Sequence, residues 1–221
     1  MPVAFELPRF YPILDTRVLA ECSCDAVKCA QGLIDGGSRI LQFRHKAEWT
    51  QEDFDTAKRI ASVCEEAGVL FVLNDRADFA KMLGAALHVG QDDLSPFAVR
   101  RVIGDEVVGF STHNRQQLLR ANDEPAEYLS LGPIFETASK DNPDPVVGIE
   151  GLRKLRPLTR RPLVAIGGIT QMNACEVLEA GANSVATISA LFVNGADRAW
   201  MRRTAQNWIG LLALPPSAAA Q

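Results

Sequence analysis

The segment Arg39–Trp49, RILQFRHKAEW, places three polar side chains two residues apart within an apolar run, at Gln42, Arg44 and Lys46. Residues two apart on a β-strand share one face. That face would carry an amide, a guanidinium and an ammonium group, which are donors suited to a ligand with several negative charges. A half-exposed strand with its polar face in water is the alternative, and the pattern alone leaves both open.

Two aspartates, Asp75 and Asp93, follow the next two apolar runs, in the segments LNDR and GQDD. Carboxylates from neighbouring strands suit Mg²⁺, which proteins hold with one or two carboxylates plus substrate phosphates. Each aspartate alone is equally well explained as the N-cap of the following helix. Together, and beside the cations Arg44, Lys46 and Lys140, they favour a site for magnesium and a diphosphate.

Small and hydroxyl-bearing residues follow the last two apolar runs. Gly167 and Gly168 come after one, and Ile188 and Ser189 end the other. Backbone N–H groups at such places often bind phosphate in barrel enzymes. A second anion site, separate from the first, implies two phosphorylated substrates or one long one.

The elements that would position these residues alternate along the chain. Amphipathic stretches such as TQEDFDTAKRIASVCEEAG have apolar residues three and four apart, and small residues stop them before each apolar run. The apolar runs predict strands at Phe10–Leu14, Ile40–Phe43, Val69–Leu73, Leu87–Val89, Val107–Phe110, Tyr128–Leu131, Leu163–Ile166 and Ser184–Ile188.

Eight such units in 221 residues predict an α/β fold, a single (β/α)8 TIM barrel that forms one domain over residues 1–221. A doubly wound open sheet is the alternative, although five or six strands are more natural for it. In a barrel the active site lies at the carboxyl ends of the strands, so we expect the polar residues above to meet there.

The segment Glu136–Gly148, ETASKDNPDPVVG, is the one irregular stretch, with two prolines and a glycine. A loop of this length in a compact barrel is usually functional or disordered. It carries Lys140, which has to reach a phosphate across the barrel mouth. We therefore expect the loop to close over bound substrate, with a merely disordered connection as the alternative.

Net charge, hydropathy and cysteine content limit which binding partners and which cellular compartment are expected. The formal net charge of −4 argues against a nucleic-acid or anionic-membrane surface. No run approaches the roughly 18 apolar residues that span a bilayer, and MPVAFELPRF lacks the features of a signal peptide. Five cysteines without disulfide spacing fit a reducing cytoplasm. Cys22, Cys24 and Cys29 as thiolate ligands are the less favoured alternative, because no fourth ligand is evident.

The motifs in this order resemble the thiamine-phosphate synthase family, whose members join a pyrimidine diphosphate to a thiazole phosphate. The resemblance runs from YPILDT to ISALF, nearly the whole chain. Its strongest parts are LQFRHK, similar to the family's Q-x-R-x-K strand, and LNDRADFAKMLGAALHVGQDDL, similar to its N-D…H-x-G-Q-x-D segment. The later segments GFSTH, LGPIFETASK, AIGGIT and GANSVATIS resemble the family's later motifs.

The resemblance implies roles for particular residues. It implies that the diphosphate binds Arg44, Lys46, Asn74 and Lys140. It implies Mg²⁺ on Asp75 and Asp93, and the pyrimidine near Gln42 and Ser111. It implies that the thiazole phosphate binds Thr137, Ser139, Gly168, Ile188 and Ser189. The implied reaction is loss of diphosphate from a benzylic-type carbon and capture of the resulting cation by the thiazole nitrogen.

Two other functions remain open at this point. A thiazole phosphate tautomerase would use His113 as an acid–base group, but it has no use for the cations and the carboxylate pair together. A non-catalytic protein that binds thiazole or thiamine phosphate is the second. On the last expected helix, Trp200 and Trp208 are expected to pack in the core, and a homo-oligomer interface is the alternative.

Overall fold

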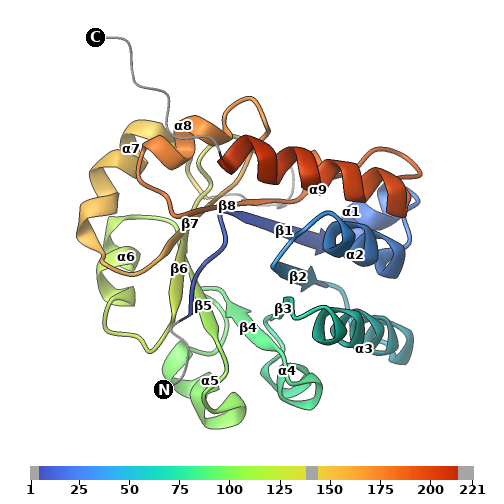
Figure 1. Ribbon diagram of the computed structural model, residues 1–221. Helices are drawn as coiled ribbons and strands as arrows, with labels where there is room; N and C mark the ends of the chain where they lie inside the picture. The colour runs from blue at the N-terminus through green and yellow to red at the C-terminus, as the bar shows by residue number, and fades with distance from the viewer. Residues whose placement is uncertain (1–4, 138–143, 214–221) are drawn as a thin grey trace.

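The computed structural model describes residues 5–137 and 144–213. Within these residues, eight parallel strands pair in chain order, and β8 pairs with β1 to close a barrel (Figure 1). The strands are β1 Phe10–Asp15, β2 Ile40–Arg44, β3 Leu70–Asn74, β4 Ala86–Val89, β5 Val108–Thr112, β6 Tyr128–Leu131, β7 Leu163–Ile166 and β8 Ser184–Thr187. The (β/α)8 barrel is confirmed, and the open sheet is excluded.

Helices follow the strands and cover the outside of the barrel (Figure 1). The α-helices are α1 Thr16–Glu21, α2 Ala26–Asp35, α3 Gln51–Glu66, α4 Ala77–Leu83, α5 Pro96–Ile103, α6 Arg115–Ala121, α7 Gly148–Leu155, α8 Ala174–Glu179 and α9 Arg198–Ala213. Two short 3₁₀ turns are η1 Arg156–Leu158 and η2 Ser189–Leu191. None of the described helices has the length and apolar character needed to cross a membrane.

The strand predictions were close, with differences at the ends. The expected eighth strand, Ser184–Ile188, is one residue too long, because the chain turns at Ile188 and enters η2 at Ser189. The second strand was drawn too short, because Arg44 still pairs with Asp15 of β1. Hydrogen bonds between neighbouring strands decide where each strand ends. The pattern of apolar residues in the sequence does not show these hydrogen bonds.

The barrel interior is filled, as in other barrels of this type. One apolar cluster lies inside the ring of strands and is joined by Phe5 and Leu7 from the segment before β1. It contains Tyr11, Ile13, Ile40, Val72, Ala86, Tyr128, Val164 and Ala186. A larger apolar cluster fills the space between strands and helices. With the interior closed by side chains, the carboxyl mouth is where a ligand can enter.

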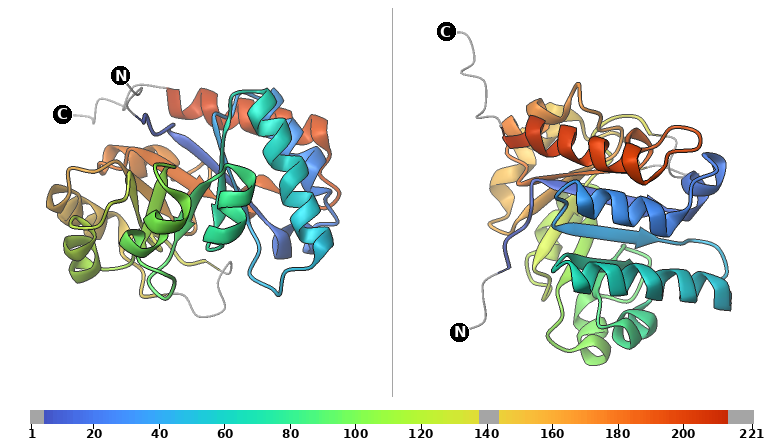
Figure 2. Two further views of the ribbon diagram at one scale, coloured as in Figure 1. Left: turned by 90° about the horizontal axis from the view of Figure 1, so that it is seen from below. Right: turned by 45° about the vertical axis from the view of Figure 1, so that its right-hand side comes forward.

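The last described helix, α9, packs beside α2, which precedes the second strand. In the right-hand view of Figure 2, α9, α2 and α3 lie side by side along the outside of the barrel. A Cβ at Gly32 would come within 2.4 Å of the Arg198 carbonyl oxygen, so glycine allows α2 and α9 to approach. Trp208 is fully buried and stacks on Phe10 with ring centroids 5.5 Å apart, whereas Trp200 is 36% exposed. Core packing was therefore right for Trp208 and wrong for Trp200.

Candidate active site

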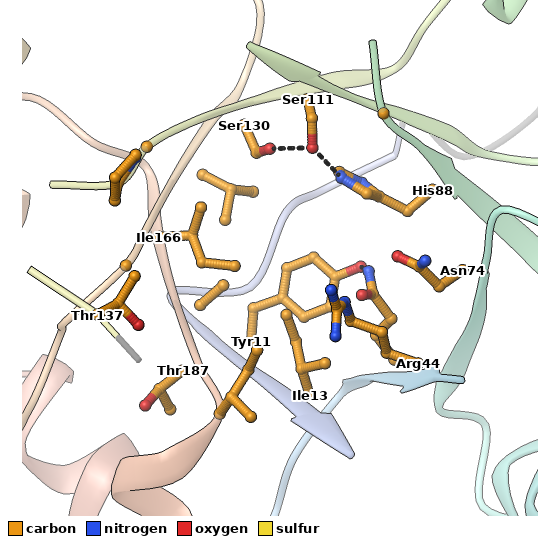
Figure 3. Close-up of a pocket in the computed structure, with 18 of the residues that line it drawn as sticks. Tyr11, Ile13, Arg44, Asn74, His88, Ser111, Ser130, Thr137, Ile166 and Thr187 are labelled. Atoms are coloured by element: carbon orange, nitrogen blue, oxygen red, sulfur yellow. Dashed lines mark hydrogen bonds between the residues drawn. The ribbon is translucent and has the colours of Figure 1, made fainter. Parts of the chain in front are cut away.

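A pocket of about 750 Å³ lies at the carboxyl ends of the strands (Figure 3). Every predicted site residue within the described ranges lines this one pocket. They are Gln42, Arg44, Lys46, Asn74, Asp75, Asp93, Ser111, Thr137, Gly168, Ile188 and Ser189. The two remaining predicted residues, Ser139 and Lys140, lie outside the described residues.

The polar face of β2 points into the pocket and not into water. Gln42 is 2% exposed, and the Arg44 side chain is 15% exposed. His45, which alternates with them, turns the other way, and its Nδ1 lies 3.0 Å from the Thr16 hydroxyl. The half-exposed strand is thereby excluded, because a solvated face would leave Gln42 accessible.

Asp15, at the end of β1, holds Arg44 in place. The two side chains form an ion pair, and Asp15 is only 2% exposed. The same carboxylate caps α1 by accepting hydrogen bonds from the backbone N–H groups of Arg17 (3.1 Å) and Val18 (3.2 Å). Sequence reasoning missed Asp15, although a carboxylate ending the first strand, beside a strand that ends in arginine, is a readable signal.

The two predicted metal ligands do come together, beside a cation. The Lys46 ammonium lies 2.5 Å from an Asp75 carboxylate oxygen. Burial raises the pKa of Asp75 to about 6; Lys46 lowers this pKa and the adjacent Asp93 carboxyl raises it. A buried carboxylate next to a second one favours a bound cation, because ionising both is otherwise costly.

The aspartates are not helix caps, which was the alternative explanation. The N-cap residues are Arg76 for α4 and Ser95 for α5. Asp93 instead accepts a 2.7 Å hydrogen bond from the Gly90 backbone N–H, which fixes it on the pocket side of the turn. Asp75 adopts a left-handed backbone with φ of 65°, which a non-glycine residue adopts only at some cost in free energy.

The fit of this pair to Mg²⁺ follows from the donor set. Within the described residues, no group of three or more His, Cys, Asp or Glu side chains could hold a metal ion. A site with a full set of protein ligands is therefore not present in that part of the chain. Two carboxylates open to the pocket match a magnesium ion that takes its other ligands from substrate phosphates and water.

Asn74 carries an unused donor. Its side chain is 5% exposed and lines the pocket, and its Nδ2 atom has no hydrogen-bond partner among the described residues (Figure 3). A buried donor without a partner costs about 1–3 kcal/mol. An acceptor atom on a ligand would remove that cost, so the Asn74 side chain is suited to bind one.

The opposite side of the pocket is built by the ends of β7 and β8. Gly167 and Gly168 have positive φ values of 100° and 63°. A Cβ at Gly168 would come within 2.4 Å of the Glu136 carbonyl oxygen, so this turn packs directly on the loop that follows β6. That loop is held by hydrogen bonds from Ile134 N to Ile166 O (2.9 Å) and from Val147 N to Pro133 O (2.8 Å). Thr137 is thereby brought to the pocket.

His113 also lines the pocket, but its ring is engaged by the backbone. Its Nδ1 lies 2.6 Å from the Gly132 carbonyl oxygen and 3.5 Å from the Asp144 carboxylate. A carbonyl can only accept, so Nδ1 carries a proton. The ring is oriented by these contacts.

A chain of buried hydrogen bonds along the floor of the pocket was missed. It joins Gln42, Tyr11, Tyr128, His88 and Ser111 across the barrel interior. The two tyrosines look like core aromatics in the sequence. His88 offers a signal, since a histidine at an inward position of a strand needs polar partners.

The fold and the pocket define a class of protein. A (β/α)8 barrel whose mouth gathers cations on one side and a glycine-rich turn on the other is an enzyme of the kind that acts on phosphorylated small molecules. Residues 10–191 match the model of the family described as thiamine monophosphate synthase. The chain belongs to that family, which is a family of transferases.

Individual relatives agree with this. The chain is 45% identical to the thiamine-phosphate synthase of Koribacter versatilis over 90% of this chain and 96% of that protein. It is 38% identical to the thiamine-phosphate synthase of Chloroflexus aurantiacus, over 83% and 84% of the two chains. The solved thiamine phosphate pyrophosphorylase of Pyrococcus furiosus superposes with a TM-score of 0.79 at 29% identity, covering 92% of this chain and 95% of that one.

Proposed function

We propose that the protein is a thiamine-phosphate synthase. It joins hydroxymethylpyrimidine diphosphate to thiazole phosphate and releases thiamine phosphate and pyrophosphate. The observation that carries the proposal is one pocket with two sides of different composition, each suited to an anion. Cations and paired carboxylates line the side formed by β2 to β4, and a glycine turn with hydroxyl residues lines the side formed by β6 to β8.

The diphosphate is assigned to the first side. Arg44, Lys46 and Asn74 supply a guanidinium, an ammonium and an unpaired amide donor there. Asp75 and Asp93 would hold Mg²⁺, whose charge would be shared with the diphosphate oxygens. In the structure the Lys46 ammonium neutralises Asp75. A divalent ion bound to Asp75 would release the Lys46 ammonium to bind a phosphate oxygen.

The thiazole phosphate is assigned to the second side. Thr137, Gly168, Ile188 and Ser189 line it, and Ser139 is added from the sequence. The ends of β7 and β8 adjoin each other, so the backbone N–H groups at their turns can face one phosphate. The hydroxyls of Thr137 and Ser189 add hydrogen-bond donors on this side of the pocket.

The chemistry asks the chain to stabilise a leaving group and to align a nucleophile. Departure of the diphosphate breaks its C–O bond and leaves the electron pair on oxygen, where Arg44 and Lys46 meet the charge. The thiazole nitrogen then donates its lone pair to the cationic carbon, so no protein nucleophile is needed. Gln42 and Ser111 hold the pyrimidine, and apolar side chains in the lining, such as Ile13, Val164 and Ile166, limit the access of water.

Small-molecule substrates and a cytoplasmic location complete the proposal, together with one domain over residues 1–221. The five cysteines are all free, and Cys29 and Cys64 are fully buried, which supports a reducing compartment. The 36% exposure of Trp200 leaves a homo-oligomer contact at α9 as the interpretation to test by light scattering.

The decisive experiment measures pyrophosphate release by the purified protein with Mg²⁺ and both substrates. Omission of either substrate or addition of EDTA should stop release. Lys140→Ala should abolish coupling while binding of thiazole phosphate survives, because the two anion sites are distinct. His113→Ala should cost far less, since the histidine is not needed for diphosphate departure.

The same variants separate the synthase from its rivals. A tautomerase would lose activity in His113→Ala and keep it in Lys140→Ala, and it would release no pyrophosphate. A protein that binds thiazole phosphate tightly and turns over neither substrate would be a non-catalytic binder. Either result overturns the proposed function.

A further inference from the structure

At the floor of the pocket, five side chains from five strands form one continuous chain of hydrogen bonds, and four of the five, all except Tyr128, line the pocket. The distances are 2.9 Å from Gln42 Nε2 to Tyr11 Oη, 2.8 Å from Tyr11 Oη to Tyr128 Oη and 3.1 Å from Tyr128 Oη to His88 Nδ1. His88 Nε2 then lies 2.9 Å from Ser111 Oγ, as Figure 3 shows. The first four residues are at most 9% exposed, so water does not compete for these bonds.

The direction of the chain follows from the number of protons available. The Gln42 amide nitrogen can only donate, so the Tyr11 oxygen accepts from it. Tyr11 has one proton, and its other partner is the Tyr128 hydroxyl, so Tyr11 donates to Tyr128. Tyr128 in turn has one proton left for His88 Nδ1. Tyr11 and Tyr128 therefore each accept one hydrogen bond and donate one, in the same direction along the chain.

The imidazole of His88 transmits this polarity to the pocket. Because Nδ1 accepts from Tyr128, the proton of the neutral ring lies on Nε2, which donates to Ser111 Oγ. Ser111 therefore has to donate its own proton elsewhere. In the structure its other partner is the Ser130 hydroxyl, 3.1 Å away at the pocket wall (Figure 3).

The two tyrosines remain protonated and in position. Burial raises the pKa of both hydroxyls well above the usual value. Gly109 makes room for Tyr128, since a Cβ there would come within 2.1 Å of the tyrosine Cζ. Phe5 packs on the same ring with centroids 5.9 Å apart. The hydroxyl of Tyr128 is thus held at one place by its surroundings.

We propose that the buried chain Gln42–Tyr11–Tyr128–His88 orients Ser111 as a hydrogen-bond donor, so that this position of the pocket selects a ligand ring with an acceptor nitrogen. Tyr11, Tyr128 and His88 are positioning residues that act through Ser111. The inference rests on the proposed function for the identity of the ring, a pyrimidine. The polarity of the chain itself does not depend on that identity.

The first test reads the His88 tautomer in the unaltered protein. Nitrogen-15 NMR of the histidine rings, assigned with a His88→Gln variant, should show the proton on Nε2 and a bare Nδ1. A proton on Nδ1 would mean that the chain runs the other way and that Ser111 accepts from the ligand. A doubly protonated ring would put a donor on Nδ1 as well, so Tyr128 could not donate to it and the chain would not set the direction at Ser111. Either outcome overturns the inference without any assay of activity.

The second test measures discrimination between two ligands. The probes are the hydroxymethylpyrimidine diphosphate and an analogue with a ring nitrogen replaced by C–H, made for each nitrogen in turn. For the replacement that faces Ser111 we expect wild-type affinity to fall about five- to tenfold, the value of one hydrogen bond. Ser111→Ala should lose the discrimination, and Tyr128→Phe should reduce it to about twofold or less.

Thr112→Val is the matched control for Tyr128→Phe. Thr112 is 1% exposed and donates to the Ser130 carbonyl oxygen at 2.7 Å, so the variant also removes a buried hydroxyl, but away from the pocket lining. It should keep the wild-type discrimination. If Tyr128→Phe does not fold, Tyr11→Phe interrupts the same chain one step earlier. Full discrimination in a folded Tyr128→Phe or Tyr11→Phe protein would contradict the inference.

The two proposals can fail separately. Absence of pyrophosphate release in the wild type would refute the synthase while leaving the NMR result to stand by itself. Normal pyrophosphate release with a His88 ring that is not protonated on Nε2 alone would refute the proposed orientation of Ser111 and leave the synthase in place.

Discussion

At the scale of single residues, the pocket gathers charges that are costly to bury and pairs them. Arg44 is neutralised by Asp15, and Lys46 by Asp75. Only the Arg44–Asp15 pair is buried, and removing one of its partners leaves an uncompensated charge and costs about 3–5 kcal/mol. The Lys46 side chain is 51% exposed, so solvent screens its pair with Asp75. This arrangement places two cations at the mouth without a large loss of stability in the absence of ligand.

Asp15→Asn tests the role of the carboxylate that was missed from the sequence. Asparagine caps helices as well as aspartate does, so the variant keeps the α1 cap and removes only the charge opposite Arg44. We expect about 2–4 kcal/mol lower stability by urea unfolding and a weaker affinity for the diphosphate. Asp35→Asn is the control, because its pair with Arg198 is exposed to solvent and contributes little to stability. Equal losses in both variants would contradict the positioning role.

Asp75 should make the metal-free protein less stable as the pH rises. Its pKa is raised from 3.8 to about 6, so between these pH values the folded state holds a proton that the unfolded state has lost. Stability therefore falls as pH rises from about 4 to 6 and levels off above, by on the order of 2 kcal/mol. In Asp75→Asn this contribution should be absent, and kcat/KM should fall by roughly two to four orders of magnitude.

Unfolding of both proteins in EDTA at pH 4.5 and pH 7.5 measures the difference directly. Asp78→Asn serves as the control, since Arg76 lowers the pKa of Asp78, and its contribution to stability has the opposite sign. Identical pH profiles for the wild type and Asp75→Asn would show that Asp75 is not perturbed. Activity that survives chelation would remove the metal role.

At the scale of elements, the second anion side depends on how closely β7 and the loop after β6 approach. The Gly167–Gly168 turn touches backbone and Cβ atoms of residues 133–136, so no side chain fits there. The sequence located this turn correctly after the seventh strand. The sequence did not show why glycine is needed at this turn. The reason is a contact between two segments about 30 residues apart in the chain.

Gly168→Ala should disrupt this side selectively. The added Cβ would meet the Glu136 carbonyl oxygen at 2.4 Å in a backbone with φ of 63°, so the turn has to move. We expect the KM for thiazole phosphate to rise at least tenfold, with little change for the pyrimidine diphosphate. Gly84→Ala has nearly the same φ, 60°, and open space around it, and should show only the backbone cost of about 1 kcal/mol. Equal KM changes for both substrates would contradict separate sites.

At the scale of the whole molecule, the barrel is closed by elements far apart in sequence. The family match ends at residue 191, before α9 begins at Arg198. Helix α9 nevertheless packs against α2 and buries Trp208 on the first strand. Helix α9 therefore stabilises β1 and α2 next to the place where β8 pairs with β1.

Trp208→Ala should destabilise the protein by about 3–5 kcal/mol, because it removes a fully buried aromatic side chain from that junction. The matched variant is Trp200→Ala on the same helix, which is 36% exposed and should cost about 1 kcal/mol or less. Thermal unfolding of the two variants checks this. Comparable shifts in Tm would mean that α9 does not close the barrel through Trp208.

The sequence by itself determined the number and order of the strands, the barrel and a set of residues that meet in one pocket. Periodicity reports which residues face the core, and in a parallel barrel every strand ends at the same mouth, so Gln42, Asp75, Asp93 and Ser111 were brought together by topology alone. Tertiary structure decided the contacts between strands that are not neighbours in the chain. The hydrogen bond between Tyr11 and Tyr128 joins residues 117 positions apart, and strand register and the space left at Gly109 set it. Such a bond has no local signature in the sequence. A tyrosine that makes a buried hydrogen bond and an aromatic residue that only packs in the core occupy the same inward positions of a strand.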